Sequence, residues 1–303
     1  DNIIRVTAGV NNAKTRAEGA GTEMKNDFSL TIVNKNAPKY TYTDKVFSKK
    51  SGDWACSETL LWQKSDALVD IVAFAPAQTG KFNGVYAEGS IQPITYSVAS
   101  DQSTDQSTSS DNNDLLYYYA PGFNPGKSLD ENGKLNIQFN HAFCMIDIVV
   151  TLGTEFNKPN VLKESPIVKV TLGGTKIAAN VNVTNAASVV TASEEAADIT
   201  TTKGSFTPAE NADKKADPEK NAISRFSCIA IPQTVAANTF KVSLMTADKL
   251  YEWTSAEPVE LKSGYRYTLK LSMGNDVVLL KGGSITASPW TEGDTGDKTL
   301  ETD

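Results

Sequence analysis

Histidine and cysteine, two side chains that often carry chemistry in protein sites, are scarce in this sequence. Among 303 residues there are one histidine, His141, and three cysteines. No GxSxG, HExxH or GxxxxGK[ST] motif occurs, and no glycine-rich turn joins a strand to a helix in a way that could cradle phosphate. The usual sequence signals of nucleotide-dependent enzymes and metallohydrolases are therefore absent from this sequence. We expect no catalytic residues, no cofactor and no metal.

Long apolar runs and clusters of positive charge are also missing. No stretch approaches the roughly 20 apolar residues that a membrane helix needs. The formal net charge is −7, the pI is about 5.0, and the 29 basic residues are scattered along the chain. Because an acidic chain repels phosphates and anionic membranes, we expect a soluble mature protein that does not bind nucleic acid.

The three cysteines are Cys56, Cys144 and Cys228, and no CxxC spacing links them to zinc or redox chemistry. We predict that they are small core side chains. The chain starts at Asp1 without an initiator methionine or a signal segment, which suggests the start of a trimmed mature protein.

Short stretches of alternating apolar and polar residues are what the sequence does contain. The most informative is Leu135–Leu152, LNIQFNHAFCMIDIVVTL, which alternates as far as Asn140 and is apolar on both faces from Ala142 onward. This pattern predicts a half-buried strand that becomes fully buried. Further alternating runs occur at 28–32, 69–74, 94–98, 168–172, 240–244 and 265–271. Such spacing indicates an all-β protein.

Helical signals are weak, and the length of the chain indicates two domains. The best helix candidates, Ser193–Asp198 and Glu210–Asn221, are short and alanine-rich or polar. A chain of this length commonly forms two domains of roughly 150 residues. The stretch 153–166, GTEFNKPNVLKESP, has the glycine and prolines of a linker. We therefore expect domains 1–156 and 157–303.

Two segments are candidates for ligand binding. The polar stretch Ser100–Asp114 carries four acids that could supply oxygen ligands to calcium, although it lacks the fixed spacing of a calcium loop, and a solvated acidic loop is the alternative reading. These acids are Asp101, Asp105, Asp111 and Asp114. Tyr117, Tyr118 and Tyr119 could stack against sugars, but strand alternation turns Tyr118 away from its neighbours and core packing is the alternative. His141 is predicted to be a structural, hydrogen-bonding histidine.

Several motifs, taken in order, match the pattern of a known protein family. The early apolar stretch IIRVTAGV is followed by TRA, and LVDIVAFAP resembles that family's strand ending in an aromatic, a small residue and proline. NDLLYYYA resembles its DLLYA motif, and LNIQFNHAFCMIDIVV resembles F-x-H followed by the buried strand that closes the first domain. SGYRYTLKLSM and ITASPWTEG resemble its closing strands and terminal tryptophan. In this order the motifs resemble the Bacteroides-type fimbrillin family of pilus subunits and related adhesins. The longer YYY and the Ser/Asp-rich insert before it depart from the pattern and leave the ligand open.

The resemblance implies two tandem transthyretin-like antiparallel β-sandwich domains made as an exported, outer-membrane-anchored lipoprotein, with a lipidated precursor cysteine preceding Asp1. It also implies that a trypsin-like protease cuts the precursor after an arginine and removes the first strand. A donor strand of another pilus subunit then fills the groove. This is strand addition, in which backbone hydrogen bonds and alternate side-chain pockets hold the partner.

On this chain the removable strand would be Ile3–Val10, and cleavage would follow Arg16. The strand's apolar face would comprise Ile4, Val6, Ala8 and Val10. Alternatively, the strand is permanent and Arg16 is an ordinary surface residue. A donor strand would have to come from Val277–Trp290, because 291–303 is polar and acidic; otherwise the protein is a tip or accessory subunit.

The expected function is therefore that of a non-enzymatic tip or accessory adhesin of the cell-surface fimbrium, with other pilus subunits and a host protein or glycan as partners. One alternative is a glycan-binding surface lipoprotein that presents tyrosine or tryptophan platforms. The other is a β-sandwich glycoside hydrolase, which needs two carboxylates roughly 5 to 10 Å apart in a cleft.

Overall fold

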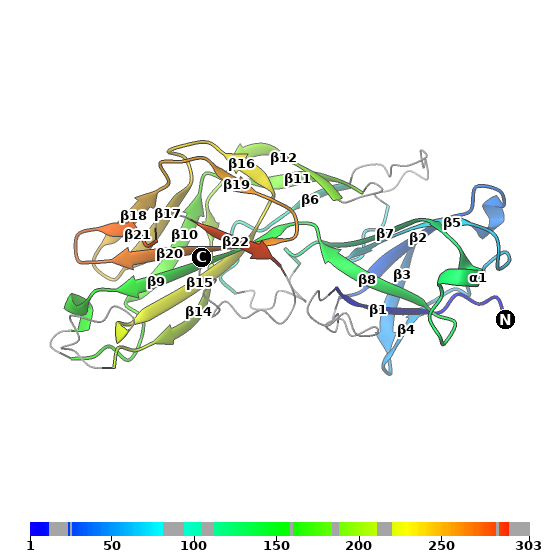
Figure 1. Ribbon diagram of the computed structural model, residues 1–303, viewed down its shortest axis with the longest axis horizontal. Helices are drawn as coiled ribbons and strands as arrows, with labels where there is room; N and C mark the ends of the chain where they lie inside the picture. The colour runs from blue at the N-terminus through cyan, green and yellow to red at the C-terminus, as the bar shows by residue number, and fades with distance from the viewer. Residues whose placement is uncertain are drawn as a thin grey trace.

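The computed structural model describes residues 1–11, 24, 26–80, 94–104, 112–157, 160–183, 188–210, 220–282 and 285–290. The molecule is elongated, with the N terminus at one end of its long axis (Figure 1). Helical structure in the described residues is limited to α1 (Pro125–Ser128) and the 3-10 turns η1 (Pro38–Tyr40) and η2 (Thr154–Asn157). All other regular elements are strands, which confirms the prediction of an all-β protein.

The sheet nearest the N terminus has seven strands in the order β1-β8-β7-β5-β2-β3-β4. Their bounds are β1 (Val6–Val10), β8 (Leu135–His141), β7 (Leu116–Phe123), β5 (Val69–Ala75), β2 (Phe28–Val33), β3 (Tyr42–Lys50) and β4 (Asp53–Cys56). The two edge strands, β1 and β4, contact each other, so the sheet curls almost into a barrel. It encloses a set of buried side chains running from Ile4 to Phe139, which we call the first core.

The rest of the molecule packs around a second core, whose buried side chains run from Val72 to Trp290. Its largest sheet has the order β14-β15-β9-β20-β21, with β22 also paired to β20. Smaller sheets have the orders β13-β10-β17-β18, β12-β11-β6 and β16-β19. The bounds are β6 (Ile94–Ser97), β9 (Cys144–Leu152), β10 (Ile167–Gly173), β11 (Lys176–Val183), β12 (Ser188–Ala196), β13 (Ile199–Thr200), β14 (Thr202–Thr207), β15 (Ile223–Ala230), β16 (Gln233–Val235), β17 (Lys241–Thr246), β18 (Leu250–Thr254), β19 (Val259–Leu261), β20 (Tyr265–Met273), β21 (Val278–Leu280) and β22 (Thr286–Pro289).

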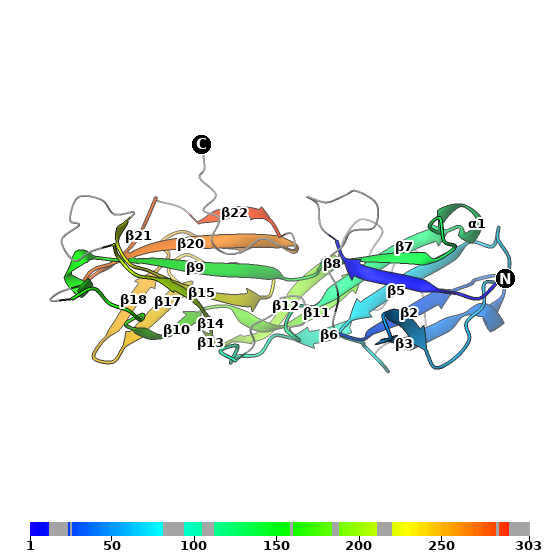
Figure 2. The same cartoon turned by 90° about the horizontal axis from the view of Figure 1, so that it is seen from below.

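The stretch Leu135–Leu152 passes from one core to the other. In β8 the buried positions alternate with half-buried ones, whereas β9 is buried at almost every position, as the sequence predicted. The two strands follow one another along the long axis of the molecule (Figure 2). β9 pairs with β15 and β20, so the expectation that this buried strand closes the first domain is wrong. Its two apolar faces reflect a central strand of the second core.

The expectation of purely antiparallel sheets is also wrong at two places. β1 runs parallel to β8, and β9 runs parallel to β20. Both pairs join strands far apart in sequence, and such long connections allow parallel neighbours that a short hairpin cannot make. Alternation along a single strand does not reveal the direction of its neighbour.

The two halves of the chain are interleaved. β6, from the first half, pairs with β11, and Val72 and Phe74 of β5 belong to the second core. The buried Gln102 side chain also receives a hydrogen bond from the backbone N–H of Ile229 (2.8 Å) and donates one to its carbonyl (2.9 Å). The division into domains 1–156 and 157–303 stays a prediction. Along the stretch Leu135–Leu152, the buried side chains up to Phe139 belong to the first core and those from Ala142 onward belong to the second.

Two further expectations concern helices and cysteines. Residues 193–196 of the first helix candidate lie in strand β12, so that expectation is wrong, and residues 211–219 of the second lie outside the described residues. Alanine and glutamate are good helix formers, but intrinsic propensity is a small energy, and pairing with β11 outweighs it. Cys144 and Cys228 are buried free thiols, as predicted, and Cys56 packs partly buried against the first core.

Candidate functional site

The N-terminal strand β1 is held to the first sheet from two sides. On one side it pairs in parallel with β8, from Val6 opposite Leu135 to Val10 opposite Phe139. The Leu135 N–H donates to the Arg5 carbonyl (2.8 Å) and the Asn11 N–H donates to the Phe139 carbonyl (2.7 Å). These bonds continue the pairing at both ends of the strand.

On the other side, the residues just before β1 pair with the segment that follows β4. The Ile4 N–H donates to the Leu60 carbonyl and the Trp62 N–H donates to the Asn2 carbonyl, both at 2.8 Å. An antiparallel bridge joins Ile3 and Leu61. The N-terminal segment therefore connects the two edges of the sheet and closes it. The sequence analysis did not predict the pairing of these two segments.

The inner face of this segment is the apolar face named from the sequence. Ile4, Val6 and Val10 are 6%, 5% and 0% exposed and belong to the first core. Ala8 is half-buried and packs against the same core. Arg16, the candidate cleavage residue, lies in segment 12–23, outside the described residues.

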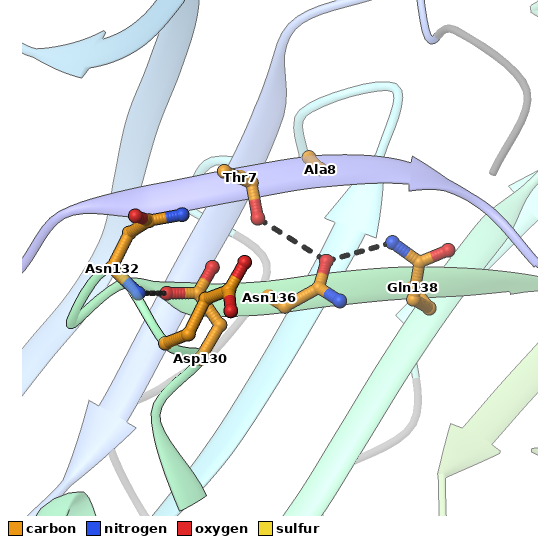
Figure 3. A pocket seen from close by; sticks show the side chains of 7 residues that line it. Thr7, Ala8, Asp130, Asn132, Asn136 and Gln138 are labelled. Atoms are coloured by element: carbon orange, nitrogen blue, oxygen red, sulfur yellow. Dashed lines mark hydrogen bonds between the residues drawn. The ribbon is translucent and has the colours of Figure 1, made fainter. Parts of the chain in front are cut away.

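The outer face of β1 and β8 is polar and borders a pocket of about 480 Å³ (Figure 3). Its lining comprises Thr7, Ala8, Asp130, Glu131, Asn132, Asn136 and Gln138. The alternation of Asn136 and Gln138 with apolar residues predicted a polar outer face on β8. Their position beside Thr7 follows only from the β1–β8 pairing.

His141, at the end of β8, is a buried structural residue, as predicted. Its Nδ1 lies 2.8 Å from Asp114 Oδ1, and both side chains are almost fully buried. The His141 ring also stacks on the indole of Trp290, with centroids 3.6 Å apart and planes within 8°. This cluster, formed by the end of β8, the segment before β7 and the residue after β22, ties the C-terminal strand to the passage between the cores.

The acidic stretch Ser100–Asp114 does not present its carboxylates together in the described residues. Asp114 points inward to His141, and exposed Asp101 accepts hydrogen bonds from Ser103, which lower its pKa. Asp105 and Asp111 lie outside the described residues. Within the described ranges no group of three or more His, Cys, Asp or Glu side chains is placed to hold a metal ion.

The aromatic residues proposed as a sugar platform pack against the cores. Tyr117 and Tyr119 are half-buried against the second core, whereas Tyr118 packs against the first, which confirms the predicted alternation. Burial raises the pKa of Tyr118 to about 12. Trp62 is buried and stacks on Phe123, with ring centroids 5.9 Å apart. None of these rings forms an open platform.

The segment considered as a donor strand, Val277–Trp290, is paired within the chain's own fold. β21 and β22 both lie along β20, and Trp290 is 5% exposed. The Trp290 N–H donates to the Gly264 carbonyl (2.7 Å). No helix in the part of the chain that the structure describes is long and apolar enough to cross a membrane.

Comparison with known proteins decides the family. The model of the fimbrillin-like family matches residues 15–290. The chain belongs to the fimbrillin-like family. This confirms the resemblance seen in the sequence and places the chain among fimbrial and cell-adhesion proteins of the cell surface, a family of structural proteins and not of enzymes. A search of the curated proteins finds no match.

Solved structures share the fold of this fimbrillin-like chain at low sequence identity. A protein provisionally described as a cell adhesion protein, from Bacteroides ovatus ATCC 8483, is 18% identical with a TM-score of 0.65, over 96% of this chain and 99% of that one. A fimbrial protein from Bacteroides vulgatus ATCC 8482 is 14% identical with a TM-score of 0.57, over 96% and 100%. The tip fimbrial protein Mfa3 from Porphyromonas gingivalis is 9% identical with a TM-score of 0.50, over 95% and 100%.

Proposed function

We propose that this fimbrillin-like chain is a tip or accessory adhesin of a pilus, and that it joins other subunits by β-strand exchange after losing its first strand. The observation that carries the proposal is the position of the N-terminal segment. It lies at the edge of the first sheet and covers the first core with the buried side chains of Ile4, Val6 and Val10.

Removal of this segment would leave a groove suited to a donor strand. The backbone of β8 would lose its parallel partner, and the Trp62 N–H and Leu60 carbonyl would lose theirs. Leu135, Ile137 and Phe139, each at most 1% exposed, would border the gap. An incoming strand with alternating apolar side chains would restore the hydrogen bonds and refill the core.

The pairing of the segment Val277–Trp290 supports a tip or accessory role over a stalk role. A stalk subunit must offer a donor strand to its neighbour. Here β21 and β22 pair with β20, and Trp290 is buried against His141, so this segment already serves the chain's own fold. The shared fold with the tip protein Mfa3 is consistent with this assignment.

The remaining expectations form part of the same proposal. The fold would correspond to two tandem transthyretin-like sandwich domains, with the first built around the seven-stranded sheet. The precursor would be an outer-membrane lipoprotein anchored through a cysteine preceding Asp1. The adhesion partner would be a host protein or glycan.

Limited digestion with trypsin tests the strand-exchange proposal. We expect cleavage after Arg16, loss of residues 1–16 from the folded body by mass spectrometry, and a shift to larger species in size-exclusion chromatography. Because trypsin also cuts after lysine, the variants are compared with an arginine-specific protease. Arg16→Ala should then abolish both the release and the shift, whereas the matched Lys14→Ala variant should retain them. Resistance at Arg16 would indicate a permanent first strand. Release of the segment without larger species would contradict self-association through the groove.

A further inference from the structure

The pocket on the outer face of β1 and β8 has a rigid, preorganised rim. At one end, the turn 130–134 is held by its own hydrogen bonds: Asp130 Oδ1 accepts from the N–H groups of Asn132 (2.9 Å) and Lys134 (2.8 Å). The Asp130 N–H donates to the Lys134 carbonyl (2.9 Å). The side chains of Glu131 and Asn132 are therefore displayed from a fixed backbone.

Side-chain hydrogen bonds among Thr7, Asn136 and Gln138 orient the part of the lining that lies on β1 and β8. Asn136 Oδ1 accepts from Thr7 Oγ1 (3.2 Å) and from Gln138 Nε2 (2.8 Å) (Figure 3). Because both donors use this oxygen, the amide nitrogen of Asn136 is left as a donor and the amide oxygen of Gln138 as an acceptor. The pocket therefore offers donors and acceptors side by side.

The chemistry of the lining selects the ligand class. Among the described residues that line the pocket, Asp130 and Glu131 contribute two formal negative charges and none is a lysine, arginine or histidine, so this lining repels an anionic ligand. An amine could use the carboxylates but would leave the amide donors of Asn132 and Asn136 unpaired, since an ammonium group only donates and cannot accept a hydrogen bond from them. Hydroxyl groups both donate and accept and match the whole set.

We propose that this pocket is a binding site for a neutral carbohydrate, with Asn132, Asn136 and Glu131 as the principal contacts. Its volume of about 480 Å³ lies within the range of roughly 300–1,000 Å³ found for small-molecule sites. Planar amides and carboxylates provide the recognition here, in contrast to the aromatic platform that the sequence offered only as an alternative.

The site also couples ligand binding to the first strand, since Thr7 and Ala8 of β1 form one wall. A sugar that contacts both β1 and β8 stabilises the state in which β1 is paired with β8. Removal of β1 removes one wall of the site. At a sugar concentration ten times the Kd, opening of β1 is expected to be suppressed about elevenfold. The role of this sugar as an adhesion ligand rests on the proposed function, whereas its binding to the uncleaved monomer does not depend on that function.

Ligand-observed saturation-transfer NMR on the uncleaved full chain tests the site, with the methyl glycosides of galactose, mannose, fucose and N-acetylglucosamine as probes. We expect at least one glycoside to bind. Asn132→Ala should weaken its binding about fivefold to tenfold, the effect of one hydrogen bond. The matched variant Asn36→Ala alters an exposed asparagine outside the pocket and should bind normally. Both sites are in turns, and circular dichroism checks that the fold is intact.

Two comparison probes and one further variant separate the alternatives. Cadaverine reports an amine site and N-acetylneuraminic acid an anion site. Glu131→Gln keeps an acceptor but removes the charge, so glycoside binding should change less than about threefold. The proposal is overturned if no glycoside binds, if only cadaverine binds, or if Asn132→Ala binds as well as the parent chain. Because the assay needs neither cleavage nor assembly, its failure is distinct from failure of strand exchange.

Discussion

Replacing Val6 with aspartate tests whether the N-terminal segment covers the first core. Val6 is 5% exposed, lies opposite Leu135 of β8 and belongs to the first core. The variant removes the burial of a valine side chain, about 1.5–2 kcal/mol, and places a carboxylate where no water can solvate it. An unpaired buried charge adds several kcal/mol, so we expect a total cost of about 3–5 kcal/mol.

The cost is expected to appear as detachment of β1 rather than as global unfolding. β1 is an edge strand, and edge segments open at lower free energy than the whole domain, whose total stability is typically about 5–15 kcal/mol. Once β1 has left the sheet, the aspartate is solvated and adds no further penalty. The other strands of the first sheet should therefore keep most of their protection.

Native-state hydrogen exchange measured by mass spectrometry distinguishes these outcomes. We expect peptides covering β1, β8 and segment 60–62 to exchange about 100- to 4,000-fold faster in the Val6→Asp variant, as a change of about 3–5 kcal/mol in free energy requires. Thr7→Asp is the matched control, because it places the same charge on the half-buried polar outer face of the same strand. Equal exchange in the two variants, or unchanged exchange in Val6→Asp, would refute the assignment of the inner face.

Three further predictions concern the cores. Burial raises the pKa of Tyr118 from 10 to about 12, so Tyr118 ionises first in the unfolded chain as the pH rises. The free energy of unfolding, measured by urea titration, should therefore fall by about 2 kcal/mol between pH 10 and 12. Tyr118→Phe should remove that part of the fall. Trp290→Ala should cost about 3–5 kcal/mol in chemical denaturation, because it removes a buried indole and its stacking on His141 and leaves a cavity. A loss no larger than that of half-buried Trp253→Ala would contradict this packing. A fragment 157–303 lacks β9 and β6 and should be unfolded by circular dichroism; a folded fragment would support the division expected from the sequence.

The alternation of apolar and polar residues was sufficient to predict the local structure of these strands. The alternation in Leu135–Leu152 correctly predicted a half-buried strand followed by a fully buried one, because burial of one or both faces leaves a direct trace in the residue pattern. The alternation of Tyr117, Tyr118 and Tyr119 likewise assigned them to opposite faces of β7. The ordered motifs identified the family, which a match over residues 15–290 confirms.

The partners of each strand depended on the tertiary structure. A residue pattern records whether a side chain is buried, but not which distant strand lies beside it or in which direction that strand runs. For this reason the sequence analysis did not find the parallel β1–β8 and β9–β20 pairs, or the bonds from residues 2–4 to 60–62.

The contrast is clearest at the first strand. The sequence by itself determined that the chain is all-β, that 3–10 has one apolar face, and that the family is fimbrillin-like. Only the tertiary structure decided that this segment closes a sheet between β8 and segment 60–62, and that its outer face shares a pocket with the turn 130–134. The physical reason is that both features are long-range contacts, formed when segments distant in sequence pack around one core.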